Sequence, residues 1–386
     1  MLMNGSLELN KKISLYFHIP FCTKKCHYCH FFVIPDKPEL HQPLIDALKL
    51  DIRQWASQLR GKELVSIYFG GGTPSLLSPE EIQQLLEEVD RHIPFDPKNL
   101  EITLEANPET ISYEKMAGFA KSGINRTSIG FQTLDDPLLI KLGRTHQANA
   151  SFDAIKKTVD AGISNISIDL MYDIPGQTLS SWENTLRQIQ HLPISHLSLY
   201  NLTIEPQTVF FKYRESLTKI VPDEECSAAM YKMAVSTLDG YGLKQYEISA
   251  FAKNHKQSKH NVGYWTGRPF LGFGPSAFSY WENKRFRAIA RFNRYLEALQ
   301  HGNSPIDFSE ELEPFERRNE LLIIALRLLE GVDIDSFEMQ HGQLDPKTHE
   351  KLQGLVKQGL LKCMGSHFSL TEHGILFYDH LAISLV

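Results

Sequence analysis

Six short runs rich in β-branched and aromatic residues recur along the first half of this 386-residue chain, separated by helical stretches. The runs span residues 13–19, 64–69, 100–106, 125–131, 163–172 and 194–202. Apolar residues recur with amphipathic helical spacing between them, at about 40–60, 78–91, 111–121, 149–161 and 179–191. Strands that alternate with helices form parallel sheets. We therefore predict an α/β fold built on an open sheet or on a full or partial barrel.

Chemically distinctive residues follow the predicted strands. Cys22 comes after the first strand, Gly70 to Thr73 after the second, Glu105 at the end of the third, Gln132 after the fourth and Asp169 near the end of the fifth. In parallel α/β folds, functional residues gather at the carboxyl ends of the strands. We therefore expect one pocket to collect all five segments.

Three of the five cysteines, Cys22, Cys26 and Cys29, lie within eight residues. Three thiolates are enough to bind three irons of a cubane iron–sulfur cluster and leave its fourth iron open. A structural zinc site is the alternative, but it needs a fourth ligand. Three histidines near the cysteines offer one: His18, His27 and His30. A disulfide is a weaker alternative, because the spacing is poor for a disulfide framework.

The CxxxCxxC spacing, with Tyr28 before the last cysteine, resembles the opening of the HemN/HemW group of radical S-adenosylmethionine (SAM) proteins. These are relatives of oxygen-independent coproporphyrinogen oxidase. The resemblance covers roughly residues 13–280, through SLYFHIPFCTKKCHYCHFF, YFGGGTPSLL, TLEANPE, RTSIGFQT, SIDLMYDIPGQT and HNVGYW. It implies a partial (β/α)6 TIM-type radical SAM barrel. Beyond it, from about residue 305, helical segments are followed by GLLKCMGSHFSLTEHG, which reads as two short strands around a turn, and by a final helix; this order predicts a C-terminal winged-helix-like α+β module. The resemblance also implies a [4Fe–4S] cluster on the three cysteines, whose free iron binds SAM and which donates one electron to it.

The resemblance also implies a set of SAM-binding residues. Glycines 71 and 72 allow close backbone approach, a buried carboxylate suits the amino group or ribose hydroxyls, and an arginine suits the carboxylate. The matched positions are Tyr16, Tyr28, Gly71, Gly72, Thr73, Glu105, Gln132, Arg144 and Asp169. Taken alone, both tyrosines read as core aromatics and each carboxylate as a cap or an ion-pair partner.

The segment His260-Asn261-Val-Gly-Tyr264-Trp265 resembles the HNxxYW motif of the HemW branch. The resemblance implies heme binding, with His260 as an axial ligand and with Tyr264, Trp265 and Phe273 as an apolar wall. We expect the segment to close over the mouth of the barrel. A lone histidine in such a position is more often a hydrogen-bonded loop residue.

Three departures distinguish the chain from the oxidase branch. Phe31 stands where the oxidases have a fourth cysteine, only 21 residues precede Cys22, and the HNxxYW motif is present. These favour a heme chaperone that transfers heme to an acceptor protein, with acceptor and electron donor unidentified. The alternative is an oxygen-independent coproporphyrinogen III oxidase or another tetrapyrrole-directed radical SAM enzyme. No catalytic side chain is assigned, and we expect coproporphyrinogen oxidase activity to be lacking.

We predict three domains: a radical SAM core (1–205), a lid or edge extension (206–304) and a winged-helix-like domain (305–386). The last 76 residues hold 12 acidic side chains against 7 Lys and Arg, and the whole chain has a formal net charge of −6. Phosphate contacts would oppose that balance, so we expect no nucleic-acid partner. We also expect no integral membrane segment, and a cytoplasmic location.

Overall fold

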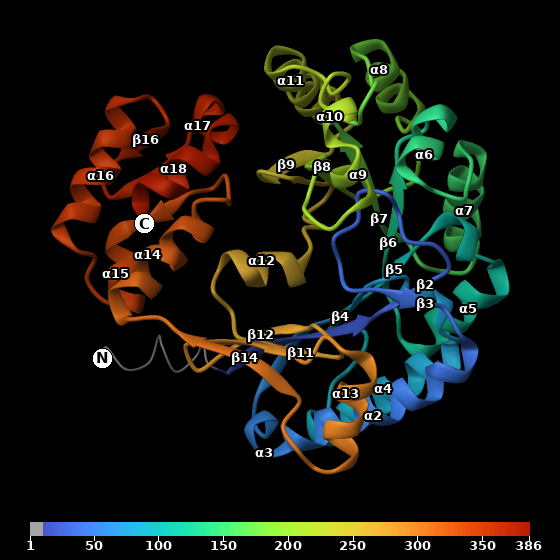
Figure 1. Ribbon diagram of the computed structural model, residues 1–386. Helices are drawn as coiled ribbons and strands as arrows, with labels where there is room; N and C mark the ends of the chain where they lie inside the picture. The colour runs from blue at the N-terminus through green and yellow to red at the C-terminus, as the bar shows by residue number, and fades with distance from the viewer. Residues whose placement is uncertain (1–10) are drawn as a thin grey trace.

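A curved twelve-stranded sheet dominates the computed structural model, which describes residues 11–386 (Figure 1). Six neighbouring parallel strands form its centre. They are β1 (Lys12–Ile19), β4 (Glu63–Gly71), β5 (Glu101–Ala106), β6 (Arg126–Gln132), β7 (Asn165–Tyr172) and β8 (His196–Asn201). Each coincides with a predicted run, so the α/β fold with a partial barrel is confirmed.

Helices between these strands cover the outer face of the sheet (Figure 1). They are α2 (His41–Gln54), α3 (Ala56–Leu59), α4 (Pro79–His92), α5 (Tyr113–Ser122), α6 (Asp136–Leu142), α7 (Ala148–Asp160) and α8 (Leu179–Gln188). Because strand side chains alternate between faces, Leu15 and Phe17 of β1 are fully buried in the main core. Tyr16 and His18, at the alternate positions, face the inside of the barrel. The predicted SAM-binding residue Tyr16 therefore lies on the concave face of the sheet.

Both edges of the parallel sheet are extended. At one edge β11 (Phe270–Phe273) pairs parallel with β1, and antiparallel strands follow. These are β12 (Phe278–Trp281), β13 (Lys284–Ala288) and β14 (Ile306–Glu311), with α13 (Phe292–Gln300) between the last two. At the other edge β10 (Ala250–Ala252) pairs with β8, and β9 (Lys244–Glu247) with β10. Helix α11 (Glu224–Gly240) precedes β9.

The C-terminal part forms a small module with its own core (Figure 1). Its helices are α14 (Pro314–Ala325), α15 (Ile334–His341), α16 (Pro346–Lys357), α17 (Glu372–Leu376) and α18 (Tyr378–Leu385). Its antiparallel sheet has the order β15 (Val332–Asp333), β17 (His367–Leu370), β16 (Leu361–Met364). Strand β14 pairs with β13 and so lies on the large sheet. The domain boundary at 305 stays a prediction.

Candidate functional site

The three cysteines lie on a loop at the carboxyl end of β1. The loop is closed where β2 (Phe21–Cys22) pairs with β3 (Ile34–Pro35). It is anchored at the far side by His27, whose backbone N–H donates to Leu142 O (2.9 Å) and whose Nδ1 lies 2.9 Å from Lys141 O. All three thiols are free and partly exposed. The loop therefore holds them at the mouth of the barrel without a disulfide.

Polar groups from two other segments approach the cysteine sulfurs. Cys22 Sγ lies 3.5 Å from Thr73 Oγ1, and Arg144 Nη1 lies 3.6 Å from Cys26 Sγ. Burial raises the pKa of Cys22 to about 11, so this thiol is protonated at neutral pH until a metal displaces the proton. Among residues 11–386 no three His, Cys, Asp or Glu side chains converge on one metal ion. A cubane does not require that arrangement, because each thiolate binds a different iron.

The glycine segment after β4 runs flush against the cysteine loop. Gly72 N donates to Ile19 O and Thr73 N to Phe21 O, both over 2.8 Å. A Cβ on Gly72 would lie 2.5 Å from Phe21 O, and one on Gly71, which has φ +107°, would lie 2.5 Å from the His18 ring. Side chains are therefore excluded at both positions.

Two carboxylates lie inside the barrel below this segment. Glu105 accepts hydrogen bonds from Tyr68 Oη (2.7 Å) and Gly71 N (3.2 Å), and burial raises its pKa to about 7. Asp169 accepts from Ser128 Oγ (3.1 Å), and burial raises its pKa as well. Both carboxylates are poised to accept further hydrogen bonds, because a buried carboxylate gains from each donor it acquires.

Arg144 lies at the same mouth of the barrel, and its guanidinium is only partly hydrogen-bonded. Its Nη2 donates to Asn107 Oδ1 (2.7 Å) and Gly130 O (2.8 Å), while Nε has no partner among the described residues. Gln132 ends β6 with φ +66°, where the register with β7 shifts. A Cβ on Gly130 would lie 2.8 Å from Gln132 Nε2 and 3.3 Å from Arg144 Nη2, so the two side chains converge there.

The two tyrosines occupy different surroundings. Tyr16 Oη lies 3.1 Å from His18 Nδ1, and its ring stacks on Tyr68 with centroids 6.2 Å apart. Tyr28, on the cysteine loop, packs against a small apolar cluster that includes Leu138. The first faces the barrel interior and the second braces the loop.

The structure thus brings the nine predicted SAM-site residues and the cysteines to one end of the barrel, and their roles remain predictions. Sequence reasoning missed two residues that join them. Asn107 Nδ2 donates to Thr73 Oγ1 (3.1 Å) while its Oδ1 accepts from Arg144. Tyr68 orients Glu105. The signal was available: Asn107 follows a strand end, and Tyr68 precedes Gly70 by two residues and so shares its face.

The HNVGYW segment lies inside the barrel. It is a helix, α12 (Lys259–Trp265), seated on the concave side of β4. Its first two N–H groups, of Lys259 and His260, each donate to the Glu101 carboxylate over 3.0 Å. A carboxylate at a helix N-terminus satisfies free donors and complements the dipole, which explains why the segment is helical.

His260 faces into the barrel and has no free nitrogen in this conformation. Its Nδ1 is hydrogen-bonded to Ser66 Oγ (2.9 Å) and its Nε2 to Tyr264 Oη (2.8 Å). Burial lowers its pKa to about 3. The His260 ring lies beside two residues of the predicted SAM pocket, with its centroid 4.8 Å from that of Tyr68 and 6.4 Å from that of Tyr16. The role of His260 as a heme ligand near this pocket stays a prediction.

The apolar wall differs from the expectation. Phe273 packs against Phe17 on the outer face of the sheet (centroids 5.3 Å), because it is an odd number of residues from Phe270. Phe270 contacts Tyr264 instead, with ring centroids 4.7 Å apart. Trp265 lies beneath the Arg327 guanidinium, 4.4 Å from the ring centroid, and Asn261 is half-buried.

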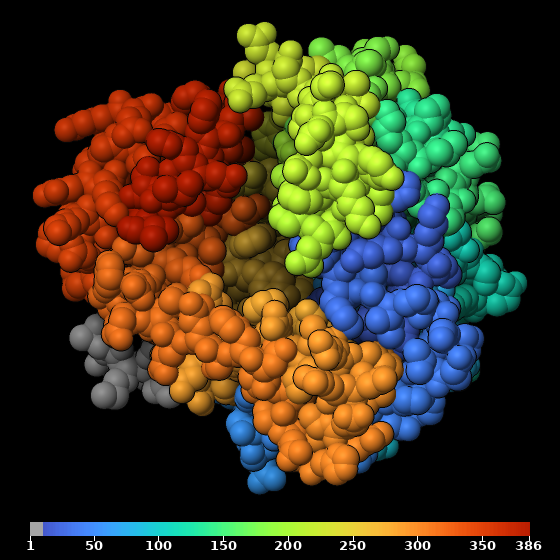
Figure 2. Space-filling model, viewed as in Figure 1, coloured from blue at the N-terminus to red at the C-terminus, as the bar shows by residue number. Residues whose placement is uncertain are grey.

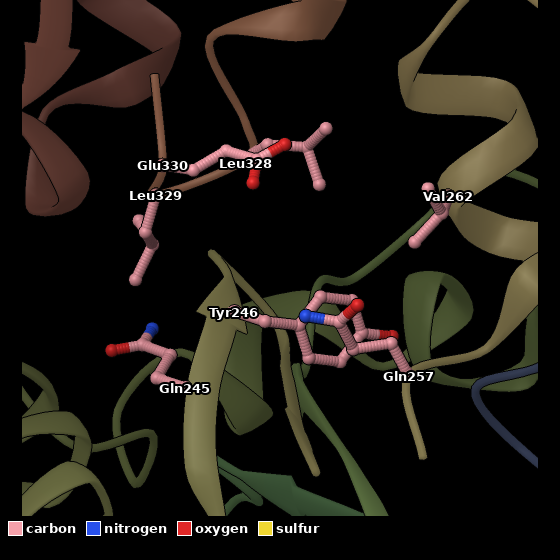
Figure 3. Close-up of a pocket in the computed structure, with 7 residues that line it drawn as sticks. All are labelled: Gln245, Tyr246, Gln257, Val262, Leu328, Leu329 and Glu330. Atoms are coloured by element: carbon pink, nitrogen blue, oxygen red, sulfur yellow. The ribbon is translucent and has the colours of Figure 1, made fainter. Parts of the chain in front are cut away.

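A cavity of about 370 Å³ lies on the other side of α12, between β9 and the C-terminal module (Figure 3). Its lining residues are Gln245, Tyr246, Gln257, Val262, Leu328, Leu329 and Glu330. Figure 2 shows the surface hollowed between the red C-terminal module and the yellow-green segment after β8. Helix α12 therefore separates the barrel interior from a second hollow.

Comparison with known proteins bears on this geometry. Residues 16–189 match the radical SAM superfamily and residues 312–377 the HemN C-terminal domain. The heme chaperone HemW of Bacillus subtilis is 34% identical over 366 residues, 94% of this chain and 96% of the relative. HemW of Escherichia coli is 32% identical over 96% of this chain and 97% of the relative.

This chain belongs to the HemW family of the radical SAM superfamily. The solved structure of Escherichia coli coproporphyrinogen III oxidase HemN, a radical SAM enzyme, covers the whole of the HemW-family chain with a TM-score of 0.86. At 22% identity, that likeness shows a shared fold.

Membership of the superfamily implies a [4Fe–4S] cluster and SAM as cofactors. The residues present fit both groups, since three free thiols share one loop and unpartnered donors and buried carboxylates surround it. Within the described part of this HemW-family chain, no helix is long and apolar enough to cross a bilayer.

Proposed function

We propose that this chain binds heme and passes it to an acceptor protein, and that it carries a [4Fe–4S] cluster on Cys22, Cys26 and Cys29 together with SAM. The observation that carries the proposal is the similarity to heme chaperones over nearly the full length of both chains. A cytoplasmic location accords with it, because ligating thiolates stay reduced there.

Different side chains at the mouth of the barrel bind different groups of SAM. When bound, the cluster supplies one electron to SAM. Glu105 accepts hydrogen bonds from the amino group, and Asp169 accepts them from the ribose hydroxyls. Arg144, whose Nε is unpartnered, donates to the carboxylate.

The remaining contacts shape the SAM pocket. Gly71 and Gly72 allow the ligand to reach the backbone, with Thr73 and Gln132 donating beside them. Tyr16 and Tyr28 flank the ligand and exclude water, which strengthens the charged contacts.

We place heme at α12. Burial keeps His260 neutral, and the neutral imidazole is the form that coordinates a metal. Coordination requires that His260 first give up its bond to Ser66 or to Tyr264. The cavity on the outer face of α12 has a volume within the range of ligand pockets. Val262 and Trp265 lie on the outer face of α12, and Asn261 lies between the two faces. Rotation of the helix about its axis would therefore bring His260 to a porphyrin bound in the outer cavity.

The test is heme titration of anaerobically reconstituted protein. We expect His260→Ala to shift the Soret band and to weaken heme binding at least tenfold, with the iron–sulfur absorption unchanged. Val262→Trp, which fills the outer cavity, should weaken binding without altering the ligand spectrum. His301→Ala, at the exposed end of α13, is the matched control. Parent-like spectra and affinity in both α12 variants would remove heme from this helix.

The oxidase alternative is tested separately. Phe31, which replaces the oxidases' fourth cysteine, is 55% exposed on the cysteine loop. We expect purified protein with SAM and a reductant to form no protoporphyrinogen from coproporphyrinogen III. Product formation at an enzymatic rate would overturn the proposed chaperone function.

A further inference from the structure

A buried arginine with few partners lies inside the barrel. Arg126 begins β6, and its side chain points to the concave face, as that of Ser128 does two residues later. It is 2% exposed. Within residues 11–386, its Nη1 makes one long hydrogen bond to Thr103 Oγ1 (3.4 Å), its Nε has no hydrogen-bond partner, and no carboxylate forms an ion pair with it. A buried charge is costly unless it is paired, so this guanidinium is available to bind an anion.

The acidic residues of the SAM site do not neutralise the Arg126 charge. Burial raises the pKa of Glu105 to about 7 and also raises that of Asp169, and the positive charge of Arg126 opposes this rise only in part. Glu105 is therefore only partly ionised at neutral pH, while Asp169 accepts a hydrogen bond from Ser128 instead. Among the residues that the structure describes, Arg126 consequently lacks a close counter-charge.

Small hydroxyl side chains line the barrel interior around Arg126. Barrels of this kind are usually filled by bulky branched side chains. Here the inward-facing positions of the strands include Ser14, Ser66, Thr103, Ser128, Ser167 and Ser198. A hydroxyl both donates and accepts hydrogen bonds, so it can turn its donor toward a bound anion. The interior therefore suits a polar, negatively charged group better than an apolar one.

Strand pairing places Arg126 near the proposed heme ligand, His260. Tyr68 pairs with Thr103, and Thr103 pairs with Arg126, so these residues form one row across β4, β5 and β6. The His260 ring lies beside Tyr68 in this row, with centroids 4.8 Å apart. Because neighbouring strands are about 4.8 Å apart, the backbones of Tyr68 and Arg126 are about 10 Å apart. The iron of a heme and its propionate carboxylates are separated on the same scale.

Tyr246 separates Arg126 from the cavity on the outer face of α12. Its ring lines that cavity (Figure 3), and its Oη lies 3.0 Å from His196 Nε2 inside the barrel. Burial lowers the pKa values of His196 and His260, and the positive charge of Arg126 adds to the decrease at both. Arg126 is therefore within electrostatic range of both histidines. A carboxylate on a porphyrin in the outer cavity would reach it by displacing the Tyr246 side chain.

We propose that Arg126 binds a propionate carboxylate of heme and thereby orients the porphyrin whose iron is held by His260. The inference rests on the proposed function, heme binding at α12. The planar guanidinium matches a carboxylate in a fork, with two parallel hydrogen bonds. The contact compensates a buried charge that the heme-free protein leaves unpaired, so it favours heme over a porphyrin whose propionates are uncharged.

The test compares heme with its dimethyl ester, in which both propionates are uncharged, on the full-length, reconstituted protein. Each is added from dimethyl sulfoxide under anaerobic conditions and followed by its Soret absorption. We expect the parent to bind heme at least tenfold more tightly than the ester, because the ester loses a charge-assisted hydrogen bond. In Arg126→Gln, the affinity for heme should fall to that for the ester, and the Soret band should keep its position because His260 is intact.

Two further variants complete the comparison. Arg187→Gln removes an exposed guanidinium on α8 and should distinguish heme from the ester as the parent does. Arg126→Lys keeps the charge but not the fork and should retain part of the preference. Without heme, Arg126→Gln should unfold at a temperature no lower than the parent, because it removes a buried charge that has no close partner.

Equal affinity of the parent for heme and for the ester would overturn the proposal, and this result needs no variant to fold. An unchanged preference for heme in Arg126→Gln would overturn it as well, and a lower unfolding temperature in that variant would then assign Arg126 a structural role. If the parent binds neither compound, the proposed function itself fails, and the role of Arg126 fails with it. If the parent binds both tightly, heme binding stands and only the propionate contact is lost.

Discussion

The Glu105 carboxylate is proposed to bind SAM, but its burial lowers the stability of the SAM-free protein. Its pKa is about 7 because the carboxylate is buried, whereas it is about 4.3 in an unfolded chain. The folded state therefore holds the proton more tightly between these values, and stability falls as the pH rises from about 4.3 to about 7. The free energy of unfolding of Glu105→Gln should accordingly exceed that of the parent at pH 8, by up to about 4 kcal/mol, with little difference at pH 4.

The same variant should bind SAM at least tenfold more weakly, since a charge-assisted hydrogen bond is worth about 1.5–3 kcal/mol. Thermal unfolding without SAM and calorimetry with SAM measure the two effects. Glu87→Gln, an exposed position on α4, is the control for both. Equal stability of variant and parent across the pH range would show that Glu105 is not held in a desolvated site.

At the scale of elements, the position of α12 depends on Glu101. Both carboxylate oxygens accept N–H groups from the first residues of the helix. Glu101→Ala leaves these donors unsatisfied and should cost about 1–3 kcal/mol, with faster hydrogen exchange confined to residues 258–266. Glu63→Ala, exposed at the start of β4, should change neither. Unaltered exchange at α12 would mean that packing against β4, rather than the carboxylate, holds the helix.

At the scale of the whole molecule, Arg327 joins the C-terminal module to the barrel. Its Nη2 donates to Glu247 Oε2 (3.4 Å), and its guanidinium lies over the Trp265 and Tyr378 rings. Arg327→Ala removes these contacts and leaves Glu247, which is 3% exposed, uncompensated. We expect the free energy of unfolding, measured with denaturant, to fall by about 2 kcal/mol. Part of this loss should be recovered in the double variant Arg327→Ala/Glu247→Gln. Additive effects of the two substitutions would show that the residues are not coupled.

Much of the site could be predicted from the sequence. The cysteine spacing, the glycine segment and Glu105 each follow a strand in the chain, and parallel strands end on one side of a sheet. Their gathering at one mouth is therefore a consequence of the alternation of strands and helices. Local patterns in the chain also indicated the small C-terminal sheet, because its strands and helices are contiguous in sequence.

What the sequence determined by itself was thus the set of elements, their parallel pairing and the residues at their ends, since these follow from the period of apolar residues and from local backbone preference. The tertiary structure alone decided where HNVGYW lies. Glu101 accepts the backbone N–H of His260 in α12, and Ser66 is hydrogen-bonded to the His260 ring, although both residues precede His260 by more than 150 positions in the chain. An apolar groove behind the cysteine loop likewise joins residues 32–40 to residues 291–294. Contacts between such distant segments depend on how the whole sheet curves, which no local pattern in the chain encodes.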